Sequence, residues 1–238
     1  MIPLFKSHCS IGKSILKIPK IFDLALKNNF KKVYLIEDSL ISFLDSHKHA
    51  KENDLQLIFG LRLKVSHDSQ NPSSVHKIIV FAKDDLGCRL INKIYSKAFS
   101  DPSGVISNKD LKSLWENKHL VLAVPFYDSF IFMNSLHFNN CIPDFSFTSP
   151  YFFLENNLLP FDLNIQDKVK KYCKDNNCKT VLTKSIFYEK RIDFNAYQTY
   201  KCICNRRFDK QRTLNVPNFD HLGSFEFCLE SFLENELS

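Results

Sequence analysis

The residues best suited to chemistry lie near the start of the chain, where "SHCSIGKS" (7–14) follows a short apolar run. Gly12, Lys13 and Ser14 match the end of a phosphate-binding loop, in which the lysine and the hydroxyl contact phosphates and Mg²⁺. His8 matches the first half of a metal-binding His-x-His pair, whose second position is Ser10. The stretch therefore points to two chemistries, nucleotide binding and metal-dependent hydrolysis.

Two neighbouring residues argue against the nucleotide-binding interpretation. A phosphate-binding loop opens with a glycine so that the backbone can curl around phosphates, and here that position is Ser7. The helix would also have to begin at Lys13, which places Pro19 inside it at a cost of about 3 kcal/mol or more. We therefore expect a loop at Gly12-Lys13-Ser14 and a helix that starts near Ile18.

Other catalytic patterns are weak or missing. Two close cysteine pairs, Cys173/Cys178 and Cys202/Cys204, could supply zinc ligands. Neither has the usual C-x₂-C spacing of a zinc site, and this favours buried or surface cysteines that bind no metal. The sequence contains no G-x-S-x-G and no Asp-x-Asp, which argues against a serine hydrolase and a simple two-metal polymerase or nuclease.

The composition is that of a globular chain. Of the 238 residues 44% are hydrophobic and 24% charged, so a single domain over residues 1–238 can bury a full core. No apolar run approaches the roughly 18 residues of a membrane span, and the start has no signal-peptide layout. We therefore expect a cytoplasmic protein with reduced cysteines and no membrane partner. The net charge of +6 suits a nucleic-acid or phosphate partner. The richest basic run, 168–179, is expected to be the solvent-exposed face of a helix.

Strand-like and helix-like segments alternate along the chain. Strands are predicted at 2–5, 32–37, 55–65, 77–83, 119–126, 149–155 and 179–187. Helices are predicted near 21–29 and over 40–53, 84–99, 108–117, 163–175 and 225–237. Strands that are apolar on both faces indicate a mainly parallel α/β sheet covered by helices. Periodicity alone leaves open whether the sheet is doubly wound or closes into a barrel.

Taken in order, these segments resemble a known family. The opening strand is followed by "GKSILKIPKIFDLALKNNFKKVYLIEDS", "KENDLQLIFGLRLKV" and "HKIIVFAKDDLGCRLINKIYSKAF", and later by "DLKSLWENKHLVLAV" and "TLNVPNFDHLGSFEFCLES". This resembles the polymerase and histidinol phosphatase (PHP) domain of bacterial DNA polymerase III alpha subunits, the C-family replicative polymerases. The resemblance implies a distorted (β/α)7 barrel and a place in DNA replication. It also implies that the last helix is truncated and that the polymerase palm is missing.

Metal-binding members of the family hold divalent ions with nine side chains at the barrel mouth. The resemblance carries those positions onto His8, Ser10, Lys17, Ser39, Arg62, His76, Phe126, Ser185 and Phe187. Only His8 and His76 keep a ligand type, and Asp38 is kept beside Ser39. Carboxylates and imidazoles are needed to offset the charge of the ions, so Lys17 and Arg62 invert the local field. We expect a degenerate site with no metal and no other cofactor, and an ion pair between Arg62 and Asp38.

The leading hypothesis is a catalytically inactive PHP domain that acts as a structural and docking module. Its expected partners are a polymerase core or other replisome subunits, such as a proofreading exonuclease. The alternative is a residual phosphoesterase or 3′–5′ exonuclease in which His8, Asp38 and His76 hold a single Zn²⁺ or Mn²⁺. A third hypothesis, direct DNA binding, rests on the net charge and on the basic run at 168–179.

Overall fold

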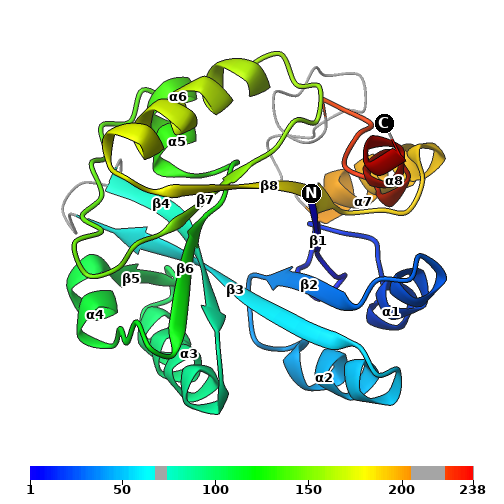
Figure 1. The fold of residues 1–238 in the computed structure, drawn as a ribbon, viewed down its shortest axis with the longest axis horizontal. Coiled ribbons are helices and arrows are strands. Elements are labelled where there is room, and N and C mark those ends of the chain that lie inside the picture. Colours follow the sequence, from blue (N-terminus) through cyan, green and yellow to red (C-terminus); the bar gives the residue numbers. More distant parts are fainter. Residues whose placement is uncertain (68–73, 205–222, 238) are drawn as a thin grey trace.

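Seven strands close into a barrel, and the helices lie around its outside (Figure 1). The structure, a computed structural model, describes residues 1–67, 74–204 and 223–237. The strands are β1 (Ile2–Phe5), β2 (Lys32–Glu37), β3 (Gln56–Ser66), β4 (Val75–Ala82), β5 (Val105–Ser107), β6 (Leu120–Val124), β7 (Tyr151–Leu154) and β8 (Lys179–Ile186). Their order in the sheet is β2-β1-β8-β7-β6-β4-β3-β5, and the additional pairing of β2 with β3 closes the barrel. The closure decides between the two architectures that the sequence left open.

The helices are α1 (Ile18–Lys27), α2 (Phe43–Glu52), α3 (Asp85–Ala98), α4 (Asn108–Ser113), α5 (Phe130–Leu136), α6 (Asp162–Asp175), α7 (Phe194–Cys204) and α8 (Leu229–Leu237), with a short 3₁₀ helix, η2, at Arg191–Asp193. The predicted start of the first helix is confirmed, with Pro19 in its first turn. The sequence analysis did not predict β5, α5 or α7. Among the described residues, no helix has both the length and the apolar character that crossing a membrane requires.

One strand runs against the others in a barrel that is otherwise parallel. β4 pairs antiparallel with both β3 and β6, whereas the other pairings are parallel. A parallel neighbour needs a crossover of a dozen or more residues, and the segment from Ser66 to Val75 is too short for one. The chain therefore returns directly, which brings the end of β3 beside the start of β4.

Apolar side chains fill the inside of the barrel and, separately, the layer between barrel and helices. The inner cluster consists of Leu4, Ile36, Ile79, Ala123 and Phe153. A Cβ on Gly60 would lie 2.7 Å from Ile36 Cδ1 and from Phe81 Cε1, so any other residue at this strand position would have to displace those side chains. A larger cluster outside the barrel packs strands against helices.

The basic run at 168–179 lies mostly on α6, an amphipathic helix. Ile165, Val169 and Cys173 are buried at a helical spacing of four, while the lysines between them are exposed. The expectation that this run forms a solvated helix face is confirmed.

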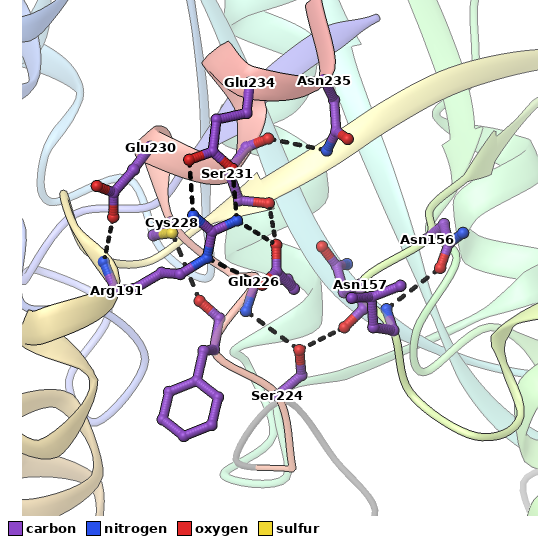
Figure 2. Close-up of polar contacts among 12 residues, drawn as sticks. Asn156, Asn157, Arg191, Ser224, Glu226, Cys228, Glu230, Ser231, Glu234 and Asn235 are labelled. Atoms are coloured by element: carbon purple, nitrogen blue, oxygen red, sulfur yellow. Dashed lines mark hydrogen bonds and ion pairs between the residues drawn. The ribbon is translucent and has the colours of Figure 1, made fainter. Parts of the chain in front are cut away.

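The end of the chain is anchored by Arg191, whose guanidinium lies between two carboxylates (Figure 2). Its nitrogens donate to Glu226 at 3.0 Å and to Glu234 at 2.7–2.8 Å, in each case through two hydrogen bonds. Its backbone N–H donates to Glu230 at 2.8 Å. These charge-assisted bonds join η2 to α8 and so place the last helix against the barrel.

Candidate functional site

The candidate site is the end of the barrel at which the parallel strands finish. Its side chains come from strand positions just beyond those that form the inner apolar cluster. Side chains on a strand alternate between faces, so the residue two positions beyond each inner residue points the same way. Two positions on from Leu4, Ile36 and Phe153 lie Lys6, Asp38 and Glu155. On the antiparallel strand β4, Lys77 lies two positions before Ile79. The mouth of the barrel is therefore lined by charged side chains of both signs.

Lys6 and Asp38 form an ion pair at the mouth, with Nζ 2.9 Å from Oδ1. The Lys6 side chain is only 4% exposed, and burial lowers its pKa to about 8. Burial alone would raise the pKa of Asp38, but the charges of Lys6 and Arg62 hold it below its usual range. Asp38 is thus an ionised carboxylate that a lysine already neutralises.

A second group consists of Arg62, Lys77 and Asp128, which follows β6. Arg62 and Lys77 donate to the same oxygen of Asp128, at 2.6 and 2.9 Å. The sequence analysis predicted that Arg62 would pair with Asp38, and that pairing is wrong, because Lys6 takes Asp38 and Arg62 takes Asp128. The charge of Arg62 still acts on Asp38, since it contributes to the lowered pKa of that carboxyl.

Glu37, at the end of β2, is buried and accepts hydrogen bonds from the loop that follows β1. The Ser7 N–H donates to Oε1 at 2.8 Å, and the Ser10 hydroxyl donates to Oε2. Burial raises the pKa of this carboxyl, and the serine donors oppose the rise. Ser10, the second position of the predicted His-x-His, therefore serves to hold a carboxylate.

Glu155, directly after β7, is likewise a buried carboxylate that accepts several hydrogen bonds. Its carboxylate accepts from the Ser185 N–H at 2.8 Å, the Ser185 hydroxyl at 2.9 Å and the Asn157 amide at 3.0 Å. It is 3% exposed, and burial raises its pKa. Ser185, which the family resemblance makes a ligand position, binds a carboxylate through its hydroxyl and its backbone.

Three other predicted positions lie near the mouth without joining these groups. His8 is exposed, and its backbone N–H donates to the Leu16 carbonyl at 2.8 Å. Lys17 is exposed at the N-cap of α1. Ser39 is half-buried directly after Asp38.

His76 points away from the mouth. Its neighbour Lys77 binds Asp128 at the mouth, and adjacent strand residues face opposite sides, so His76 faces the outer layer. There its ring packs edge-on against Phe130 and Phe145, at centroid distances of 5.8 and 6.5 Å. The mouth-facing residue of this part of β4 is Lys77, a third cation beside Lys6 and Arg62.

The two phenylalanines at predicted ligand positions are packing residues. Phe126 is fully buried in the outer core and meets Tyr127 edge-on at 4.9 Å. Phe187 stacks on Tyr197 and Phe227, at 5.8 and 5.5 Å. Phe187, a ligand position only by the family resemblance, is therefore held in an aromatic stack.

The residues that suggested a phosphate-binding loop are occupied in holding the opening loop to the rest of the protein. The Gly12 N–H donates to the Tyr200 hydroxyl at 3.1 Å, and the Ser14 hydroxyl donates to the Phe187 carbonyl at 2.9 Å. The helix begins only at Ile18, so Lys13 does not lie at a helix N-terminus. The expectation of a loop here is confirmed.

The structure does not bring His8, Asp38 and His76 together. Within the described residues, one group of three His, Cys, Asp or Glu side chains could share an ion, and it consists of His67, His76 and Cys141. The cysteine pairs Cys173/Cys178 and Cys202/Cys204 form no such group in the same part of the chain. All eight cysteines are free thiols.

Sequence reasoning missed Lys6, Lys77, Asp128 and Glu155. Lys6 and Glu155 could have been found, because each directly follows a predicted strand or ends it, where barrel residues converge. Asp128 follows β6 in a segment for which neither the pattern nor the resemblance gave a register. Lys77 was missed because the resemblance assigned its neighbour His76 to the mouth.

No family model matches this sequence, and no curated protein matches it. Among solved structures, the chain is similar to a candidate metal-dependent phosphoesterase from Bifidobacterium adolescentis, with a TM-score of 0.48 and 8% sequence identity. The match covers 76% of this chain and 86% of the other. The chemistry of this chain therefore has to be derived from its own side chains.

Proposed function

We propose that this chain is a non-catalytic PHP-type barrel that serves as a structural and docking module of a DNA polymerase III alpha-type replication complex in the cytoplasm. The observation that carries the proposal is the internal neutralisation of the mouth. Lys6 takes Asp38, and Arg62 and Lys77 share Asp128. A multi-metal phosphoesterase centre needs carboxylates and imidazoles that are free to face the ions.

Two further carboxylates, Glu155 at the mouth and Glu37 beside it, are also engaged. Glu37 and Glu155 are buried, and hydroxyl, amide or backbone donors occupy their oxygens. A divalent ion would have to displace those donors and would meet three cationic side chains in the same space. Like charges at such short range in a partly buried site oppose ion binding strongly. The mouth is therefore built to hold the barrel together without metal.

The class of partner comes from the sequence resemblance. In alpha subunits the PHP domain packs against the polymerase core and, in some bacteria, carries the proofreading exonuclease. We therefore expect this chain to bind a polymerase core or that exonuclease. DNA is a second possible ligand on charge grounds, and its binding should weaken steeply with added salt.

The first test is direct binding. The purified chain is mixed with the polymerase III alpha core and, separately, with the exonuclease subunit of the same organism, and complexes are measured by size-exclusion chromatography and biolayer interferometry. We expect a stable complex with at least one of them. Failure to bind either would remove the docking role.

The second test is hydrolysis. The chain is assayed with Mn²⁺, Zn²⁺ and Mg²⁺ against bis-(p-nitrophenyl) phosphate, p-nitrophenyl phosphate and 3′-labelled DNA. We expect the same background rate for the native protein and for His8→Ala. Metal-dependent turnover that His8→Ala abolishes would contradict the proposal and favour the alternative phosphoesterase with His8, Asp38 and His76.

A further inference from the structure

A cluster of two histidines and a cysteine lies outside the barrel, on the opposite face of β4 from the mouth. His67 follows the end of β3, His76 lies on β4, and Cys141 lies in the segment between α5 and β7. Each offers one ligand atom, and the three atoms lie within 4.8 Å of one another. Two histidines nine residues apart and a cysteine remote from both in sequence therefore meet at one potential coordination centre.

The three side chains are close enough to reach one ion after small movements. Zinc bonds to imidazole nitrogen and thiolate sulfur are about 2.0–2.3 Å long, so two ligands on a tetrahedral ion are roughly 3.3–3.7 Å apart, whereas the ligand atoms here lie within 4.8 Å of one another. Cys141 Sγ already contacts the His76 ring, at 3.6 Å from Nδ1. The two imidazoles face each other at a centroid distance of 5.0 Å with 10° between their planes. His67 is half-buried just after the end of β3, and sharing an ion requires its ring to rotate out of this stacked arrangement.

Two buried nitrogens in the cluster point to a missing ligand. Nε2 of His67 and Nε2 of His76 are buried and have no hydrogen-bond partner. His76 itself is 2% exposed. Buried polar atoms in folded proteins are normally paired, and an unpaired one calls for an explanation such as a bound ion. An ion in the plane of the His76 ring would supply a partner to its Nε2, and to Nε2 of His67 once that ring rotates out of the stacked arrangement.

The surroundings of His76 are those of a metal-binding imidazole. A backbone hydrogen bond to Ser74 engages the ring, and this contact orients the imidazole as outer-shell carbonyls do at zinc sites. Phe130 and Phe145 exclude water from one side.

We propose that His67, His76 and Cys141 bind one Zn²⁺ ion, with a fourth position open to water or another ligand. Two imidazoles and one thiol form a nitrogen–sulfur set that suits zinc. On binding, the Cys141 S–H bond breaks, a zinc–sulfur bond forms, and one proton leaves to solvent. The ion joins the end of β3 and the start of β4 to the segment before β7, and its role is structural. The site is independent of the barrel mouth, so its failure would leave the proposed docking role untouched.

The test is titration of the metal-stripped protein with Co²⁺, a spectroscopic stand-in for Zn²⁺. We expect one equivalent to bind, with d–d bands of tetrahedral intensity and a thiolate-to-cobalt charge-transfer band in the near ultraviolet. One equivalent of Zn²⁺ should remove these bands. Cys141→Ser should lose the charge-transfer band, and His67→Gln should weaken Co²⁺ binding at least tenfold.

Matched controls separate this site from other thiols and imidazoles. Cys173→Ser replaces another buried cysteine outside the cluster and should keep the full spectrum. The pair His47→Gln and His49→Gln removes the histidines of α2 and should keep the stoichiometry. If Cys141→Ser does not fold, as judged by circular dichroism, His67→Gln at a half-buried position provides the test. Absence of the charge-transfer band in the native protein, or an equal loss in Cys173→Ser, would overturn the proposal.

Discussion

Replacing Asp128 by Asn tests the view that the barrel mouth is held together by its own charges. Asp128 is a carboxylate that both Arg62 and Lys77 contact. Its φ is +63°, and Asn is among the residues that tolerate this left-handed conformation best. The backbone hydrogen bond from the Lys77 N–H to the Asp128 carbonyl, at 3.0 Å, remains possible. The substitution therefore removes a charge with little change in backbone preference.

The magnitude follows from the exposure of the three side chains, which is 13% for Arg62, 24% for Lys77 and 41% for Asp128. Removing one partner of a fully buried pair costs about 3–5 kcal/mol, and an exposed pair contributes about 0–1 kcal/mol. Two largely buried cations lose one partly exposed anion, which places the expected loss at about 2 kcal/mol. Part of it arises because Arg62 and Lys77 then repel each other without compensation.

The assay is urea unfolding at pH 7, followed by circular dichroism and by the fluorescence of Trp115. Asp54→Asn is the control, since Asp54 also has a positive φ, of 52°, is exposed, and has no cationic partner among the described residues. We expect it to change stability by less than about 0.5 kcal/mol. Adding Lys77→Met to Asp128→Asn should recover about 1 kcal/mol, because one uncompensated cation disappears.

Two results would refute this reasoning. The first is a loss below about 0.5 kcal/mol for Asp128→Asn, which would mean that solvent already screens the group. The second is equal stability of Asp128→Asn with and without Lys77→Met, which would mean that the two cations do not interact.

Three further predictions concern the mouth, the barrel interior and the C-terminal helix. The pKa of Asp38 is held below its usual value of 3.8, so its ionisation stabilises the fold above that pH and ceases to do so as the pH falls through and below it. The stability advantage of the native protein over Asp38→Asn, more than about 1 kcal/mol at pH 7, should therefore shrink below about pH 4 in thermal unfolding, and an advantage that does not vary with pH would contradict this. Gly60→Ala should cost about 1–3 kcal/mol in urea unfolding, because its Cβ meets Ile36 Cδ1 at 2.7 Å, and Ile36→Val, which deletes that methyl, should recover part of the loss. No recovery would show that the crowding lies elsewhere. Arg191→Lys should lower stability by about 1 kcal/mol and speed amide exchange in α8, since lysine cannot reproduce the forked bonds to Glu226 and Glu234. Arg89→Lys, on the exposed face of α3, should have no such effect.

Most strands and several helices could be predicted from the sequence, because their signals are local. Pro19 marks the start of α1, and the spacing of Ile165, Val169 and Cys173 marks the buried face of α6. α5 was missed because its seven residues, "FIFMNSL", are too few for a helical period to appear. β5, with three residues, is likewise short and depends on its pairing with β3.

The candidate site was only partly predictable, because side-chain direction at a strand end depends on register. The neighbours His76 and Lys77 illustrate this. A shift of one residue along β4 changes which of the two side chains faces the mouth and which faces the outer layer. The ion-pair partners of the charged residues could not be predicted from the sequence either. From residue type alone, Arg62 could pair with either Asp38 or Asp128. The barrel geometry decides that Asp38 pairs with Lys6.

The sequence by itself determined the alternation of strands and helices and the loop at Gly12-Lys13-Ser14. These follow from local propensity and residue type, which the chain carries at every position. The tertiary structure alone decided that the sheet closes, that Asp128 joins Arg62 to Lys77, and that His76 meets His67 and Cys141. Such contacts join residues far apart in the chain, so they exist only once the barrel has fixed the direction of each strand.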